Sequence, residues 1–149
     1  MTTLQPQRHE DTKVSLDDAS HYPPLSPDTE RIAKEIVDAA FKVHSALGPG
    51  LIESVYEACV CHELKKRGVP FKTQVSFPIV YDGLRLDSGL RLDLLVDESI
   101  VVELKAVDQM HSVYEAQLLS YLKLTGHRLG FLINFNVPRI KDGIKRIIL

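Results

Sequence analysis

The spacing of apolar residues changes at Pro70, and this change constrains the fold more than any other feature of the sequence. Before Pro70, apolar residues recur at intervals of three and four, which predicts helices over residues 28–47 and 51–67. A Gly-Pro-Gly segment, residues 48–50, separates the two helices. After Pro70, apolar and polar residues alternate, which is typical of half-buried strands. The chain therefore combines a helical first part with a strand-rich second part.

The second part predicts a fixed order of strands around one helix. The predicted strands cover residues 71–81, 84–96, 100–107, 129–135 and 144–149. Between the third and the fourth strand, residues 112–125 form an amphipathic helix that ends at Gly126. Two helices, a three-stranded meander, a crossover helix and one or two further strands predict an α/β fold, in which helices pack on a mixed sheet.

The first 27 residues differ in composition from the rest of the chain. They contain four of the eight prolines, none of the eight glycines and a single aromatic residue. Because so few apolar residues are available to offset the entropy of ordering, residues 1–27 are expected to form a disordered or loosely docked tail. Residues 28–149 have the length of a single domain with one core.

Several classes of protein are disfavoured by the remaining composition. No apolar run approaches the roughly 18–20 residues that span a bilayer, and the first residues lack the apolar stretch of a signal peptide. Cys59 and Cys61 stand two apart in a predicted helix and point about 200° apart around its axis, so they cannot pair. A reducing, cytoplasmic setting is therefore expected. Walker A, GxGxxG and GxSxG motifs are absent from the sequence.

The charge balance bears on nucleic-acid binding. The chain carries 18 Lys and Arg against 20 Asp and Glu, whereas domains that hold nucleic acid by bulk electrostatics usually carry a basic excess. The tail accounts for the whole net charge of −2, so residues 28–149 are balanced. Basic residues gather at 65–72 and 139–146, where they either flank a groove or form ordinary solvated ends. The balance argues against strong non-specific binding of DNA.

The segment RLDLLVDESIVVELKA, residues 91–106, is the most informative stretch. If residues 97–99 form a three-residue turn between two antiparallel strands, the residue numbers of each cross-strand pair add up to 196. Asp93 then stands opposite Glu103. Strand alternation then places Asp93, Glu103 and Lys105 on one face of the sheet. The other face is expected to carry four apolar residues, Leu92, Leu94, Val102 and Leu104.

Two carboxylates that stand opposite each other destabilise a sheet unless a partner neutralises them. One candidate partner is a divalent cation such as Mg²⁺, which binds carboxylate oxygens and water. The other is a proton shared with the help of Lys105. In the first case, Lys105 could orient the attacking water and stabilise a charged transition state. Spacing alone leaves an alternative open, an exposed strand face with a cross-strand Asp–Lys pair.

Two pairs of residues, each one helical turn apart, could join this site. Gln117 and Tyr121 both offer hydrogen-bond donors, so they either position a phosphate or leaving group or form an ordinary polar flank. Glu53 and Tyr56 open the second helix, where Glu53 either adds a metal ligand or simply favours the helix dipole. The histidines lack metal-binding spacing, and among them His111 is the candidate for contact with substrate.

At this point the sequence resembles a known family. The segment LGPGLIESVYE, residues 47–57, contains a GxxExxY motif and resembles the bacterial GxxExxY protein family, a branch of the PD-(D/E)XK nuclease superfamily. The resemblance covers about residues 28–149. Further matching segments follow in order: RLDLLV at 91–96, VVELKAV at 101–107, EAQLLSYLKLTG at 115–126 and GFLINFN at 130–136. It implies a restriction-endonuclease-like αβββαβ core.

The resemblance also implies a role for each matching residue. Asp93 and Glu103 would be catalytic metal ligands, Lys105 would be the catalytic lysine, and Glu53 would complete the metal site. Leu92 stands where the superfamily often has proline.

Substrate contacts are implied in the same way. Gln117 and Tyr121 resemble the QxxxY element of RecB-like and Cas4-like nucleases, which contacts substrate near the metal. Tyr56 of the GxxExxY motif is expected to contact substrate with them.

Two functions follow from the resemblance. The first is a nuclease that uses Mg²⁺ or Mn²⁺ to hydrolyse phosphodiester bonds, in DNA more readily than in RNA. The alternative is a catalytically weak or inactive nuclease-fold module that serves as an accessory subunit in DNA repair or defence, which the small size and balanced charge favour. A homodimer through the sheet edge or the first helix, or an assembly with protein partners, is a further expectation.

Overall fold

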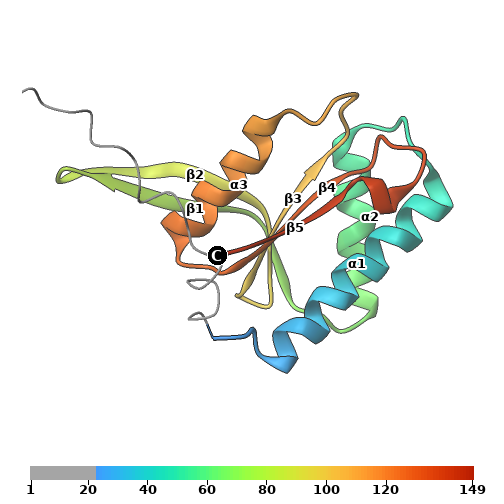
Figure 1. Ribbon diagram of the computed structural model, residues 1–149, viewed down its shortest axis with the longest axis horizontal. Coiled ribbons are helices and arrows are strands. Elements are labelled where there is room, and N and C mark those ends of the chain that lie inside the picture. The colour runs from blue at the N-terminus through green and yellow to red at the C-terminus, as the bar shows by residue number, and fades with distance from the viewer. Residues whose placement is uncertain (1–22) are drawn as a thin grey trace, which may run out of the picture.

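The computed structural model describes residues 23–149, and it confirms the predicted order of helices and strands (Figure 1). Most of the predicted tail, residues 1–27, lies outside the described residues, and Pro27 is already the first residue of a helix. The elements are α1 (Pro27–Leu47), α2 (Glu53–Lys66), β1 (Phe71–Tyr81), β2 (Leu84–Val96), β3 (Ile100–Lys105), α3 (Ser112–Thr125), β4 (Leu129–Asn134), a single 3₁₀ turn η3 (Ile140–Asp142) and β5 (Ile144–Ile148). Among the described residues, no helix is both long enough and apolar enough to cross a membrane.

The five strands form one mixed sheet in the order β1-β2-β3-β4-β5. Three of its four strand pairs are antiparallel, while β3 and β4 are parallel and are joined through α3. Helices α1 and α2 cover one face of the sheet, and α3 covers the other (Figure 1). The predicted α/β class and the restriction-endonuclease-like arrangement are confirmed.

Local signals explain where the helices begin and end. The hydroxyl of Ser26 accepts a hydrogen bond from the backbone N–H of Thr29 at 3.1 Å and so caps α1. Gly126 ends α3 with a φ of 76°, in the left-handed region that favours glycine. The α2 helix begins at Glu53, two residues later than predicted.

The spacing of apolar residues in α2 predicts a buried face of Leu51, Val55, Ala58, Cys59 and Leu64, which is wrong in part. Leu64 is buried and Cys59 packs against the core, but the side chains of Leu51 and Val55 are exposed. The helix instead buries Tyr56, Val60, Glu63 and Leu64. The physical reason is that the ring of Tyr56 stacks on Phe135, with ring centroids 4.5 Å apart, and thereby sets the rotation of the helix.

Two hydrophobic cores lie on opposite faces of the sheet. The larger core joins α1 and α2 to the sheet through residues that include Ile36, Val43, Tyr56, Leu64, Val102, Leu104, Phe131 and Ile133. The smaller core joins α3 to the sheet through Leu90, Leu92, Leu95, Val101, Leu118, Leu122 and Leu132. Leu118 lies directly over Gly130, where a Cβ atom would come within 3.0 Å of it.

The expected side of the sheet is wrong for Leu92. It was predicted to share a face with Leu94, but Leu92 packs in the smaller core and Leu94 in the larger one. The β1–β2 ladder lacks a pair between Thr73↔Leu94 and Val75↔Leu92, and Gln74 has a φ of 51° there. The left-handed residue interrupts the ladder of β1 with β2 at the level where the side chains of β2 change faces.

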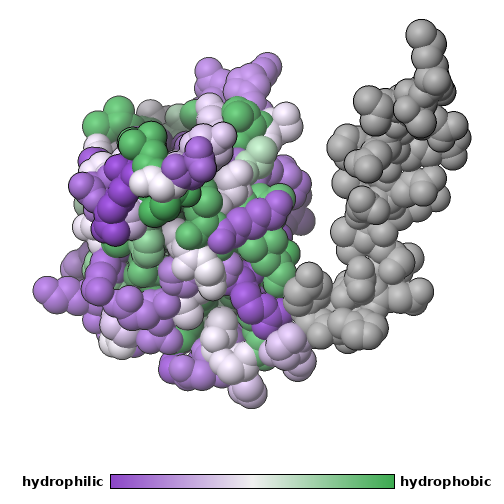
Figure 2. All heavy atoms as spheres, turned by 90° about the vertical axis from the view of Figure 1, so that its left-hand side faces the viewer, coloured by the Kyte–Doolittle hydropathy of each residue, from purple (hydrophilic) through white to green (hydrophobic). Residues whose placement is uncertain are grey.

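The β1–β2 hairpin is much longer than the strand beside it. Pairing between β2 and β3 covers only Val96↔Ile100 to Leu94↔Val102, whereas β1 and β2 stay paired to Tyr81↔Leu84. The hairpin therefore projects from the sheet as an arm (Figure 1). Figure 2 faces this end of the molecule and shows hydrophobic residues among hydrophilic ones, consistent with the exposed side chains of Val80, Leu84 and Leu86.

Candidate active site

The strands β2 and β3 separate at the residues that the sequence predicted to stand opposite each other. Their pairing follows the predicted register and ends at Leu94↔Val102. Beyond it, the backbone N–H of Asp93 donates to Oε1 of Glu103 at 3.2 Å, and the N–H of Leu104 donates to Oδ2 of Asp93 at 2.9 Å. The two side-chain carboxylates therefore accept hydrogen bonds that backbone carbonyl groups would accept in a continuous β-ladder. We call the point where β2 and β3 separate, together with the side chains of Asp93, Glu103 and Lys105, the fork.

Burial sets the electrostatics of the fork. The side chain of Glu103 is only 5% exposed. Burial raises the pKa of Glu103 to about 9, with a further contribution from the negative charge of Asp93. A carboxylate pair in such a place is stable only with a proton or a cation to neutralise it.

Lys105 lies at the end of β3 and faces α3. Its Nζ stands 4.7 Å from the centre of the Tyr114 ring, a cation–π contact that the sequence did not reveal. Among the described residues, Lys105 forms no salt bridge with a carboxylate within 4.0 Å. The ammonium is therefore held in position by an aromatic ring while its charge stays available.

Gln117 and Tyr121 lie on the face of α3 that overlooks the fork. The side-chain amide of Gln117 donates to the hydroxyl of Tyr121 at 2.8 Å, in agreement with their spacing. Burial raises the pKa of Tyr121, and the charge of Glu103 raises it further. The helix therefore brings two polar groups near the predicted carboxylate pair.

Glu53 approaches the fork from the other side, at the start of α2. It is half-buried, and its pKa is raised by burial and then by the charge of Asp93, while Lys105 lowers it. Within residues 23–149, however, no three His, Cys, Asp or Glu side chains gather closely enough to hold a metal together. The predicted set of three carboxylates is thus a close pair, Asp93 and Glu103, with Glu53 at longer range.

Tyr56 has a different place from the one predicted. Its side chain is fully buried, its hydroxyl donates to the carbonyl of Gly48 at 2.6 Å, and it accepts from the N–H of Leu51 at 3.1 Å. A buried ring whose hydroxyl is already bonded on both sides offers nothing to a substrate. This placement favours a role for Tyr56 in positioning the loop that leads into Glu53 over contact with substrate.

Asn134 supports the site and was not singled out from the sequence. It is buried and pairs with Lys105 across the parallel strands. Its side-chain amide accepts from the N–H of Val107 at 3.1 Å and donates to the carbonyl of Val107 at 3.0 Å. Asn134 thereby fixes the backbone directly after the lysine.

The chemistry of the fork fits a hard divalent cation. Mg²⁺ prefers oxygen ligands and commonly binds through one or two carboxylates while it keeps several waters. Asp93 and Glu103 supply carboxylate oxygens at one place, where burial and the charge of Asp93 raise the pKa of Glu103 and a proton or a cation is required to neutralise the pair. A Cys or His cage for a softer metal is absent from the described residues.

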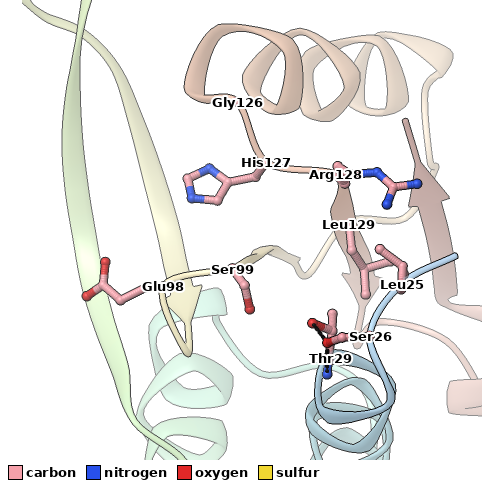
Figure 3. A pocket seen from close by; sticks show the side chains of 9 residues that line it. All are labelled: Leu25, Ser26, Thr29, Glu98, Ser99, Gly126, His127, Arg128 and Leu129. Carbon is pink, nitrogen blue, oxygen red and sulfur yellow. Dashed lines mark hydrogen bonds between the residues drawn. The ribbon is translucent and has the colours of Figure 1, made fainter. Parts of the chain in front are cut away.

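One of two surface hollows lies beside the fork and the other does not. An open hollow of about 410 Å³ along α3 is lined by Val113, Tyr114, Ala116, Gln117 and Ser120, and so includes two residues next to the fork. A second hollow of about 370 Å³ lies near the start of α1 (Figure 3). Its residues include none of the predicted site residues, and in Figure 3 the side chains of Glu98 and Arg128 point away from each other.

The basic clusters of the sequence are largely paired with acids. Lys72 bonds Glu98 at 2.6 Å, and Arg146 bonds Glu30 at 2.6 Å. Lys66 and Arg67 lie within 4.0 Å of Glu63. These residues are therefore better described as solvated ends than as a phosphate-binding groove.

The order of the sheet and the carboxylate–lysine fork together define an α/β protein of the restriction-endonuclease-like class. A profile of the PD-(D/E)XK nuclease superfamily matches residues 30–147, which include both strands of the fork and all of α3. The chain therefore belongs to the PD-(D/E)XK nuclease superfamily. Neither curated proteins nor solved structures gave a significant match. Membership indicates nuclease activity and a nucleic-acid partner, and members of this superfamily generally use divalent metals.

Proposed function

We propose that the chain is a nuclease that hydrolyses phosphodiester bonds in DNA with Mg²⁺ or Mn²⁺ held at the fork. The observation that carries the proposal is the pair of buried Glu103 and half-buried Asp93, which lies beside a lysine without a carboxylate partner among residues 23–149. The bound cation would supply positive charge at the scissile phosphate. Glu53 would assist from longer range.

The other side chains would bind and orient the substrate. The ammonium of Lys105, held against Tyr114, would orient the attacking water and stabilise negative charge on the phosphate. Gln117 and Tyr121 would donate hydrogen bonds to the strand, and the hollow beside them would receive it. His111, whose ring lies 5.8 Å from that of Tyr114, is a further candidate contact.

The finer classification is part of the proposal. The sequence 50–56 fits the GxxExxY group, and the contact between Gln117 and Tyr121 supports a RecB-like or Cas4-like QxxxY element. The burial of Tyr56 suggests why a tyrosine would be required in the first motif, since it secures the loop before Glu53.

The test is a cleavage assay with single- and double-stranded DNA and Mn²⁺. We expect Lys105→Ala to lower the rate by about 10³-fold, roughly 4 kcal/mol of lost transition-state stabilisation. The matched control is Lys123→Ala, an exposed lysine in the last turn of α3, which should cleave at the normal rate.

Two outcomes would contradict the proposal. Equal cleavage by the unchanged protein and by Lys105→Ala would mean that a contaminating nuclease is responsible. Absence of cleavage together with absence of Mn²⁺ binding in calorimetry would favour the alternative, an accessory module with a nuclease fold in DNA repair or defence.

A further inference from the structure

Three polar side chains beside the fork form a chain of hydrogen bonds that the proposed mechanism does not use. The side-chain amide of Gln74 donates to both carboxylate oxygens of Glu57, at 3.2 Å each. The amide oxygen of Gln74 accepts from Nε of Arg91 at 2.7 Å. Glu57 follows Glu53 by one turn of α2, and its charge reaches Glu53. The chain of bonds therefore begins next to the site and ends at a guanidinium.

Gln74 occupies an unusual position in the sheet. It lies in β1 at the level of Asp93, between the pairs Thr73↔Leu94 and Val75↔Leu92. Its φ of 51° is rare for a residue other than glycine. Such a conformation is energetically unfavourable and persists where the surroundings enforce it, often at functional sites. The strained residue is the one whose side chain joins Glu57 to Arg91.

Arg91 differs in its partner from the arginines that form salt bridges in the described part of the chain. Among residues 23–149, four arginines bond a carboxylate within 4.0 Å, namely Arg31, Arg67, Arg85 and Arg146, while Arg128 bonds the backbone carbonyl of Leu149. Arg91 bonds a neutral amide through Nε, and among residues 23–149 it has no carboxylate within that distance. Its charge is therefore not neutralised, and the two terminal nitrogens of an oriented guanidinium match the oxygens of a phosphate.

We propose that Arg91, positioned by Gln74, binds a phosphate of the substrate strand next to the one that is cleaved. This inference rests on the proposed nuclease function. Arg91 precedes Asp93 by two residues on β2, about 7 Å of extended chain, so it would serve a neighbouring phosphate. Most basic residues at 65–72 and 139–146 are paired with acids, whereas Arg91 and Lys105 have no carboxylate within 4.0 Å among residues 23–149.

The test measures binding of a fluorescent single-stranded DNA by anisotropy, in an Asp93→Asn parent that should not cleave. We expect Arg91→Ala to weaken binding about tenfold, as expected for loss of one charge-assisted hydrogen-bonded contact. The slope of log K against log salt should fall by about 0.7, the value for one phosphate on a single strand. The matched control is Arg85→Ala, on the same strand and already paired with Asp87 at 2.7 Å, which should change neither quantity.

Gln74→Gly tests the positioning role. Glycine relieves the left-handed backbone and removes the amide, so the midpoint of urea unfolding should stay nearly unchanged while DNA affinity falls. Affinity and salt slope that are the same for Arg91→Ala and Arg85→Ala would overturn this inference and leave the nuclease proposal intact. Absence of DNA binding by the parent, with absence of cleavage by the unchanged protein, would overturn both.

Discussion

The two faces of β3 differ sharply although they belong to the same six residues. Ile100, Val102 and Leu104 enter the larger core under α1 and α2, which is apolar throughout this part of the sheet. On the opposite face, only Val101 enters the smaller core, and Glu103 and Lys105 follow it toward α3. One face therefore contributes stability, while the other gives up apolar packing for a buried carboxylate that the fold must neutralise.

The largest change in stability should come from the apolar face. Leu104→Ala removes a fully buried side chain, so we expect a loss of about 2–5 kcal/mol in the free energy of unfolding. The fraction that remains folded should cleave DNA at a rate within a few-fold of normal. Urea unfolding and a cleavage assay on the same samples measure both, and Leu104→Met, which conserves volume, should cost less than about 1.5 kcal/mol. A stable but inactive Leu104→Ala protein would contradict the division between the faces.

On the polar face of β3, replacing the buried carboxylate should raise the free energy of unfolding rather than lower it. Because the pKa of Glu103 is raised in the folded protein, increasing pH ionises this group in the unfolded chain first and favours unfolding. Glu103→Gln should therefore be more stable than the unchanged protein. The difference in the free energy of unfolding should begin to grow near pH 4.5 and become constant near pH 9. At pH 8 without metal, the gain should be on the order of a few kcal/mol.

Urea unfolding at several pH values, in the presence of a chelator, measures this difference. The variant should also be inactive as a nuclease at every pH. A difference in stability that does not change with pH would mean that folding does not raise the pKa of Glu103.

A smaller effect should come from the loop that joins the larger core to Glu53. Tyr56→Phe keeps the stacked ring and removes two hydrogen bonds to the backbone, so we expect a loss of about 1–2 kcal/mol and a several-fold lower rate. Tyr121→Phe offers the comparison on the other face, with a lower rate and nearly unchanged stability. If Tyr56→Phe matched the unchanged protein in both stability and cleavage rate, the assignment of a positioning role to Tyr56 would be contradicted.

The sequence alone predicted the fold and the register of the fork. Periodicity identified each long element to within about two residues, because a period of two and a period near 3.6 are distinct signals. The three-residue turn at residues 97–99 fixed the pairing Leu94↔Val102, and through it the meeting of Asp93 and Glu103. These features are local, since they depend on residues that lie close together in the chain.

What the sequence could not predict depends on contacts between distant segments. The exchange of faces at Leu92 lies at the level of the left-handed residue Gln74, which belongs to another strand. Tyr114 and Asn134 reach Lys105 and Val107 only after α3 and β4 have folded back onto β3. The burial of Tyr56 was missed for the same reason, since its spacing from Glu53 does not reveal that its ring stacks on Phe135.

The most direct test of the fork is a calorimetric titration with Mn²⁺ at pH 7 in two buffers with different heats of ionisation. We predict that the unchanged protein binds Mn²⁺ and releases a proton from the carboxylate pair, because the pKa of Glu103 is raised to about 9. Asp93→Asn should bind far more weakly, while Asp87→Asn, an exposed carboxylate on the hairpin arm, should bind normally. Equal binding of Mn²⁺ by Asp93→Asn and the unchanged protein would contradict the assignment of the fork as the metal site.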